Sequence, residues 1–243
     1  MGILIFSYYG CVKDNDIPPN NESDCNTSSI FNPTKTYDTM TDQEGNVYKT
    51  IQIGSQIWMA ENLRTTKYRN GEKIPEVTEN STWNNLNTGA YCNYNNTKSN
   101  DTICTFGRLY NWSAVIDDRK IAPSGWHVPT YGEWMILENH LGDSVAGKKL
   151  KETGSLHWQY SLNKEGDNET GFTALPGGYR WVSYAGGTGF FHIGIEGGWW
   201  TVTEGDPNNL ENAHHITMGY NYNFLGGCNC SKRDGYAVRC VKD

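Results

Sequence analysis

The sequence carries little charge and has no basic run. Charged residues make up 19% of its 243 residues, and the formal net charge is −7. The densest basic spots are Lys148, Lys149 and Lys151, and the pair Lys232-Arg233. Because nucleic-acid binding needs a clustered positive face that neutralises phosphates, we expect no nucleic acid among the partners of this chain.

A long hydrophobic run is also missing. No stretch approaches the roughly 20 apolar residues of a transmembrane helix. Hydrophobic residues are only 37% of the chain, while glycine contributes 27 residues and tyrosine 15. Such a composition favours short strands, turns and ordered loops over long helices.

The signatures of common catalytic and metal sites are absent as well. The sequence contains no HExxH, GxSxG, P-loop or CxxC pattern, and Cys228 and Cys230 are its only close pair of cysteines. Two such thiolates could bind a soft metal ion, but disulfide bonds in an oxidising compartment explain a total of seven cysteines more simply. We therefore expect a protein that is not an enzyme.

One cysteine lies close to the N-terminus. Residues 3–9, ILIFSYY, are apolar and aromatic, and Cys11 follows after one glycine. This pattern is typical of the end of a bacterial lipoprotein signal peptide, so we predict that residues 1–10 are removed and that Cys11 carries a lipid anchor. The alternative is a structural Cys11, paired for example with Cys25. Residues 11–40 are polar and rich in Pro and Asn, which predicts a flexible tether.

Without the lipidated residue, an even number of cysteines remains for disulfide bonds. Cys92 and Cys104 flank a polar loop whose ends could meet. Cys240 is expected to pair with Cys228 or Cys230 on the preceding loop. Cys25 would then take the other and tie the tether to the domain. The disulfide candidates are Cys25, Cys92, Cys104, Cys228, Cys230 and Cys240.

Local patterns predict short elements of both kinds. A turn signal at residues 44–46 precedes an alternating strand over 47–53. Thr130 and Glu133 form a capping box that starts a helix ending at Gly142, and a second short helix covers 144–151. Short glycine-punctuated strands are expected at 171–175, 179–184, 189–195, 198–203, 213–218 and 235–241.

Seven blocks of residues 42–243 resemble one family, the major paralogous domain first named from Fibrobacter succinogenes and common in surface lipoproteins of Bacteroidota. The resemblance implies a single domain over residues 41–243. It also implies an α+β fold like that of C-type lectins and formylglycine-generating enzymes, with short twisted antiparallel strands, one or two helices and long ordered loops. The blocks are GNVYKTIQIGSQIWMAENLRTTKYRNGEKIP, GRLYNWSAV, APSGWHVPTYGEWMILENHLG, GKKLKETGSLHW, NETGFTALPGGYR, GGWWTVTE and GYAVRCVKD.

For function, the resemblance implies a non-catalytic lipoprotein of the outer membrane that faces the cell exterior. Its loops would bind a glycan or a protein, and we expect Trp181, Tyr184 and Tyr222 to contact the ligand. One alternative is an accessory subunit of an outer-membrane protein complex. Another is a formylglycine-generating-type metal oxidoreductase that uses Cys228 and Cys230.

Two further kinds of site follow from short patterns. The loop EGDPNNLEN is rich in oxygen donors, so Asp206 and Glu211 are candidate ligands of a structural calcium ion, the one cofactor considered. Three Asp-Ser/Thr-apolar triplets match the O-glycosylation acceptor of Bacteroidota. Their acceptor residues are Thr39, Thr102 and Ser144.

Overall fold

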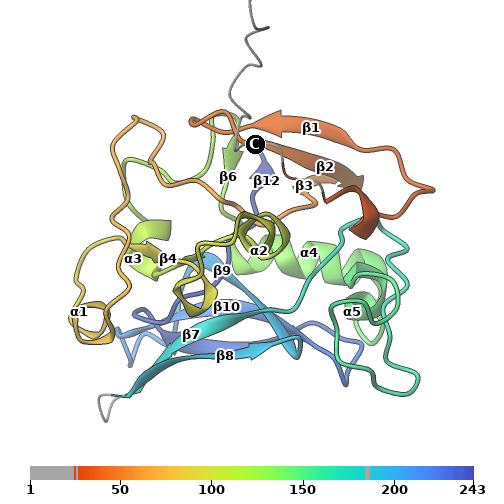
Figure 1. Ribbon diagram of the computed structural model, residues 1–243. Helices are drawn as coiled ribbons and strands as arrows, with labels where there is room; N and C mark the ends of the chain where they lie inside the picture. Colours follow the sequence, from red (N-terminus) through yellow and green to blue (C-terminus); the bar gives the residue numbers. More distant parts are fainter. Residues whose placement is uncertain (1–24, 26, 184–186) are drawn as a thin grey trace, which may run out of the picture.

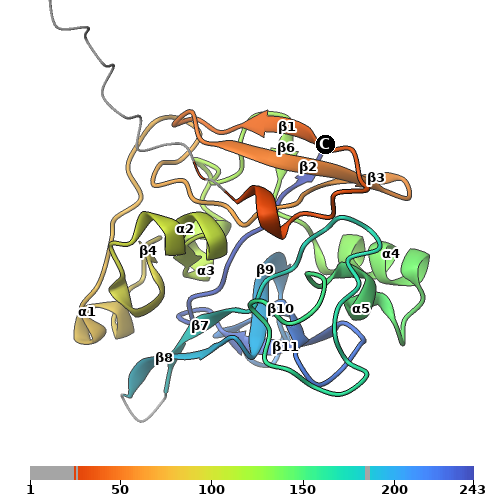
Figure 2. The same cartoon turned by 45° about the vertical axis from the view of Figure 1, so that its right-hand side comes forward.

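The computed structural model describes residues 25, 27–183 and 187–243. Two five-stranded sheets form the upper and the lower part of the molecule in Figure 1, and helix α4 (Tyr131–Leu141) lies between them. In Figure 2, the short helices within residues 80–115 lie on one side of the molecule, and α4 lies on the other. Among the described residues, no helix is both long and apolar enough to cross a membrane.

The upper sheet contains the two ends of the domain. Its strand order is β1-β2-β3-β12-β6, and all its neighbouring strands are antiparallel. The last strand of the chain therefore lies between two strands that are more than 100 residues earlier in the sequence. The strands are β1 (Asp38–Thr41), β2 (Val47–Ile53), β3 (Gln56–Met59), β6 (Trp126–His127) and β12 (Val241–Lys242).

The lower sheet is formed by one continuous part of the chain. Its order is β11-β10-β9-β7-β8, in which only the β7–β9 pair is parallel. The strands are β7 (Gly177–Val182), β8 (Thr188–Ile193), β9 (Glu196–Glu204), β10 (Asn212–Gly219) and β11 (Gly226–Ser231). A separate two-stranded sheet pairs β4 (Tyr91–Cys92) with β5 (Leu109–Tyr110).

The helices are short, and α4 is the longest of those described. The capping box predicted at its start is confirmed, because the Thr130 hydroxyl accepts from the Glu133 amide while the Glu133 carboxylate accepts from the Thr130 amide. The others are η1 (Ser28–Ile30), α1 (Asn80–Asn84), η2 (Tyr94–Asn96), α2 (Asn100–Phe106), α3 (Trp112–Val115) and α5 (Ala146–Leu150).

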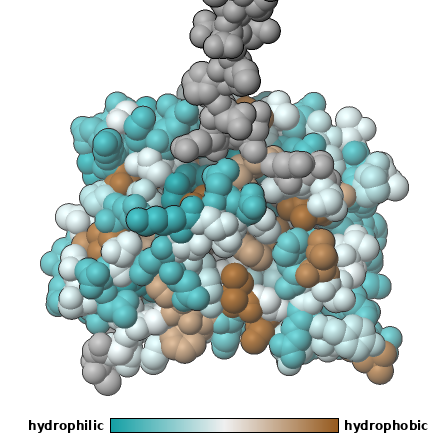
Figure 3. Space-filling view, viewed as in Figure 1, coloured by the Kyte–Doolittle hydropathy of each residue, from teal (hydrophilic) through white to brown (hydrophobic). Residues whose placement is uncertain are grey.

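Aromatic side chains fill the core. Trp134 of α4 packs against Trp58 of β3, with ring centroids 4.7 Å apart, and against Trp199 of β9. The buried Arg239 guanidinium lies over Phe172 and donates to the side-chain oxygen of Asn62. On the face shown in Figure 3, apolar residues form small groups between polar ones. The buried cluster around Trp134 thus contains residues of both sheets.

The predicted α+β, C-type-lectin-like fold is wrong. The structure is mostly β, with about 32% strand and 17% helix, and its two sheets are curled half-barrels. The physical reason is the same composition that predicted short strands, since glycine, asparagine and aromatic residues favour twisted hairpins over helices. The fold class was inferred from the resemblance of sequence blocks to a family. That resemblance does not determine how the strands pair.

Several strand predictions also differ from the structure. The predicted strands at 171–175 and 235–241 are mostly irregular, with isolated bridges such as Lys151–Ala174 and Trp199–Ala237. Strand β11 was not predicted, because its sequence GGCNCS contains no β-branched or aromatic residue. Its pairing with β10 stabilises it instead.

The predicted tether is partly folded. Ile30 and Phe31 are buried in the main core, and β1 pairs with β2, so the domain begins before the expected boundary at residue 41. Burial of two large apolar side chains explains why this polar stretch packs on the domain. The predicted signal peptide and the lipidation site Cys11 lie outside the described residues.

Candidate metal centre

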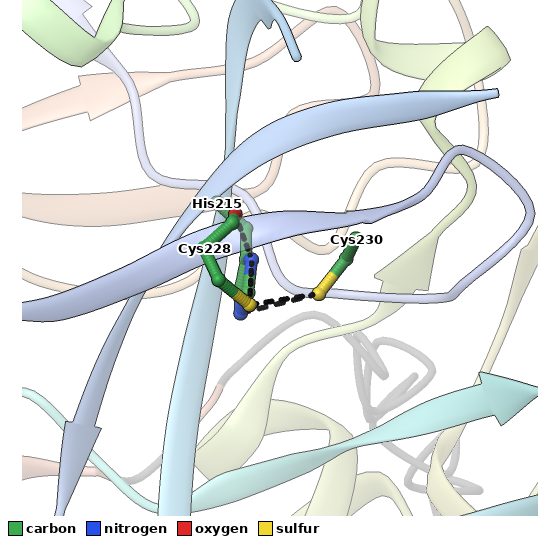
Figure 4. Close-up of side chains that lie close together, drawn as sticks. All are labelled: His215, Cys228 and Cys230. Carbon is green, nitrogen blue, oxygen red and sulfur yellow. Dashed lines mark hydrogen bonds between the residues drawn. The ribbon is translucent and has the colours of Figure 1, made fainter. Parts of the chain in front are cut away.

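Three side chains with metal-binding atoms meet on the lower sheet. His215 lies on β10, and Cys228 and Cys230 lie on β11. The two strands are antiparallel, with His215 directly opposite Cys228. Because side chains alternate along a strand, two cysteines separated by one residue point to the same face. Figure 4 shows that both sulfur atoms lie beside the imidazole.

The distances in this group are short. The Cys228 and Cys230 sulfur atoms are 3.5 Å apart, and Cys230 Sγ is 3.7 Å from His215 Nε2. One donor atom from each of the three residues lies within 4.8 Å of the others. His215 Nδ1 is 2.9 Å from the backbone carbonyl oxygen of Cys228. A carbonyl only accepts hydrogen bonds, so Nδ1 carries the proton and Nε2 keeps a lone pair toward the sulfur atoms.

Neighbouring aromatic rings hold the imidazole in place. The Tyr236 ring stacks on His215, with centroids 4.5 Å apart and planes 25° apart, and Trp200 packs on the same imidazole edge to face. The Tyr236 hydroxyl is 3.4 Å from Cys230 Sγ. His215 and Tyr236 are both buried, at 2% and 3% exposed. The ligand geometry is therefore fixed before any ion binds.

The two thiols influence one another. Hydrogen bonds with Cys230 and then His215 lower the pKa of Cys228 well below its ordinary value. The contact with Cys228 raises the pKa of Cys230, because a second ionisation would place two thiolates side by side. The pair thus loses its first proton easily and its second with difficulty. A cation between the sulfur atoms would remove that repulsion.

The three donors line a cavity of about 420 Å³. Two acidic residues also line this cavity, and burial raises the pKa of Asp234 to about 7 and raises that of Glu196. An aromatic wall completes it, with Tyr179 and Trp181 from β7. Strands β7, β9, β10 and β11 and the segment that follows β11 all contribute to the site.

Of the predicted ligand-contacting aromatics that the structure describes, Trp181 lies here and Tyr222 does not. Trp181 lines the cavity and is 43% exposed. Tyr222 lies after β10, where its hydroxyl contacts Thr217 and its ring stacks on Phe224. Tyr184 lies outside the described residues.

The predicted disulfide pairing is wrong. Cys104 bonds to Cys25, not Cys92, while Cys92 and Cys240 are free and buried in different clusters. Cys240 cannot reach β11 because β12 pairs inside the upper sheet. Cys228 and Cys230, expected to pair with other cysteines, are free and face each other.

The calcium and glycosylation candidates stay predictions. The Asp206 carboxylate accepts hydrogen bonds from the amide and side chain of Asn208, and the backbone carbonyl of Glu211 accepts from Lys232. Among the described residues, metal-binding side chains converge in a group of three at the His215 site and not at this loop. Of the glycosylation candidates, Thr39 and Ser144 are exposed and Thr102 is half-buried in α2.

Sequence reasoning missed His215 and the acidic and tyrosine residues around it. The neighbouring His214-His215 pair is visible in the sequence. However, a separation of 13 residues between His215 and Cys228 matches no known metal-binding motif. Only the hairpin register of β10 and β11 brings these residues together. A pattern search for Cys-x-Cys opposite a histidine in a paired strand would have found the site.

Comparison with known proteins identifies the family. The family model described as the Fibrobacter succinogenes major domain matches residues 51–242, which include every residue of the centre. No curated protein and no solved structure matches the chain. The match covers more than half of the sequence. The chain therefore belongs to the Fibrobacter succinogenes major domain family.

Proposed function

We propose that this protein binds a thiophilic metal ion, best Zn²⁺, through His215, Cys228 and Cys230. The convergence of their three donor atoms within 4.8 Å carries the proposal. Thiolate and imidazole are the donors that Zn²⁺ takes in proteins, and mixed Cys and His sets are common for this ion.

The spacing of the donors supports Zn²⁺. With Zn–S bonds of about 2.3 Å and Zn–N bonds of about 2.0–2.1 Å, ligands at tetrahedral angles lie about 3.5–3.8 Å from one another. The Sγ–Sγ distance of 3.5 Å and the Sγ–Nε2 distance of 3.7 Å fall in this range. Cys228 Sγ is 4.0 Å from Nδ1 of the same imidazole, so the Cys228 side chain would turn toward Nε2 on binding.

The test is a titration of the reduced, chelator-stripped protein with Zn²⁺ against a chromogenic competitor. We expect one ion per chain, and Co²⁺ in its place should give an intense sulfur-to-cobalt charge-transfer band. Cys230→Ser removes one thiolate and should weaken Zn²⁺ binding at least about 100-fold.

The matched control is Cys92→Ala, because Cys92 is a free, buried thiol in another cluster. It should leave the stoichiometry and affinity unchanged. Unchanged Zn²⁺ binding in both Cys230→Ser and His215→Gln would show that the ion binds elsewhere, and the proposal would fail.

A second proposal concerns recognition at the cell surface. The exposed indole of Trp181, at the rim of the same cavity, supports binding of a glycan or a protein there. A glycan array and cell-surface pull-downs, each repeated with Trp181→Ala, test this role. Binding that does not change in this variant would exclude the Trp181 surface.

A further inference from the structure

We propose that the bound ion keeps one coordination position for an outside ligand, and that this ligand is a neutral aromatic nitrogen base such as imidazole. The inference rests on the proposed Zn²⁺ site and names the kind of molecule that this site recognises. It depends on the number of protein donors, the charge around them and the shape of the cavity wall.

The first argument is the coordination number. Zn²⁺ in proteins takes four ligands, and sites that act on other molecules supply three and leave the fourth to an exchangeable one. Among the described residues the converging group has three members, His215, Cys228 and Cys230. His215 is buried, but Cys228 is exposed and all three line the 420 Å³ cavity. The fourth position can therefore be reached from solvent.

The second argument is charge. Two thiolates already neutralise Zn²⁺, so a further anion would give the centre a net negative charge. No Lys or Arg side chain lines the described cavity, while the carboxyl groups of Glu196 and Asp234 do. The lack of a cationic partner disfavours an anionic fourth ligand, and each of these carboxyl groups adds repulsion when it is ionised. A neutral nitrogen donor adds no charge, and imidazole nitrogen suits Zn²⁺.

The third argument is the aromatic wall. The Trp181 indole is 43% exposed at the cavity, and Phe191 supports it edge to face at 6.0 Å between centroids. Tyr179 lies on the same strand and also lines the cavity. A flat heterocycle bound to the ion can stack on such a wall, which a linear or tetrahedral anion cannot do.

The experiment uses the Co²⁺-loaded protein, because the visible bands of Co²⁺ respond to a change of its fourth ligand. Imidazole and azide are titrated in parallel at constant ionic strength. We expect saturable spectral changes with imidazole and at least about tenfold weaker binding of azide. Trp181→Ala should weaken imidazole binding about fivefold, because one aromatic stacking contact contributes roughly this factor to affinity.

Phe224→Ala is the matched control, since Phe224 is an exposed aromatic outside the cavity lining. It should leave the imidazole titration unchanged. Azide that binds as tightly as imidazole, or a spectrum that imidazole does not change, would overturn this inference while leaving the metal site intact. Failure of Co²⁺ itself to bind would instead overturn both proposals, so the two failures are separable.

Discussion

At the residue scale, a buried ammonium group joins two loops. Lys151 is 1% exposed, and its Nζ donates to the backbone carbonyls of Lys164, Gly219 and Tyr222 at 2.8, 3.1 and 2.9 Å. Burial lowers the pKa of Lys151 to about 8. The three carbonyl oxygens use all three protons of the charged form, so the contacts offset part of the cost of burying the charge.

Lys151→Met should therefore destabilise the protein by about 2–4 kcal/mol, because it leaves buried carbonyls without a donor. Urea-induced unfolding measures the loss. Lys149→Met is the control, since Lys149 lies in α5 two residues before Lys151, but is partly exposed and pairs with Glu169 at the surface. A loss below about 1 kcal/mol is expected there. Equal losses in the two variants would contradict this account of Lys151.

At the element scale, one histidine joins β6, α4 and the C-terminus. His127 Nε2 is 2.7 Å from the Glu133 carboxylate, and its Nδ1 is 2.7 Å from that of Asp243. Burial disfavours the charged imidazole and by itself would lower its pKa. The hydrogen bonds to Asp243 and then Glu133 have a larger combined effect, so the pKa of His127 is raised. The charged imidazole thus stabilises the folded state.

A pH dependence of stability follows from this raised pKa. The contribution of His127 is fully present below its unfolded pKa of about 6.5, and it is lost as pH rises through the higher folded pKa. Because the ring is 39% exposed, the loss should stay below about 1 kcal/mol. Unfolding free energies at acidic and alkaline pH measure it. His127→Gln should remove this component, and an unchanged profile in the variant would refute the assignment.

Strand β9 positions the candidate metal centre by the close approach of its backbone to an aromatic ring. A Cβ atom on Gly198 would lie 2.5 Å from the Tyr236 ring, which stacks on His215. Gly198→Ala should push this ring from its place, lower stability and weaken Zn²⁺ binding about tenfold. Gly132→Ala in α4 meets nothing closer than 3.8 Å and is the control. Wild-type Zn²⁺ affinity in Gly198→Ala would disprove the positioning role.

At the scale of the whole molecule, the disulfide joins the segment before η1 to α2. Cys25 and Cys104 are 79 residues apart in sequence, and Ile30 and Phe31 pack into the core just after Cys25. The covalent link restricts the unfolded chain over a long loop. It also keeps the first segment close to the core residues that it covers.

Loss of this bond should destabilise the protein by about 2–4 kcal/mol. We expect the same decrease in unfolding free energy for Cys25→Ser, for Cys104→Ser and for the double variant, because each removes one and the same bond. Denaturant unfolding without reductant measures the three. Losses that add up in the double variant would mean that the two sulfur atoms act independently and that the bond does not form in solution.

The sequence by itself determined the local features. The capping box of Thr130 and Glu133, the strand over 47–53 and most strands of the lower sheet were predicted, because hydrogen bonds and side-chain alternation between near neighbours specify them. Family membership was also readable from the blocks that the family model matches. The exposure of Trp181 was also predictable, because the residue lies in a segment between the family blocks, where exposed aromatic residues are expected.

Only the tertiary structure decided the fold class, the disulfide and the candidate metal centre. Each depends on which distant segments meet: Cys25 with Cys104, β12 between β3 and β6, and His215 opposite Cys228. Strand register is set by the burial of whole faces and by turn geometry, which no pair of residues encodes alone. A weak strand such as β11 forms because β10 pairs with it, and this pairing brings the three donor atoms together.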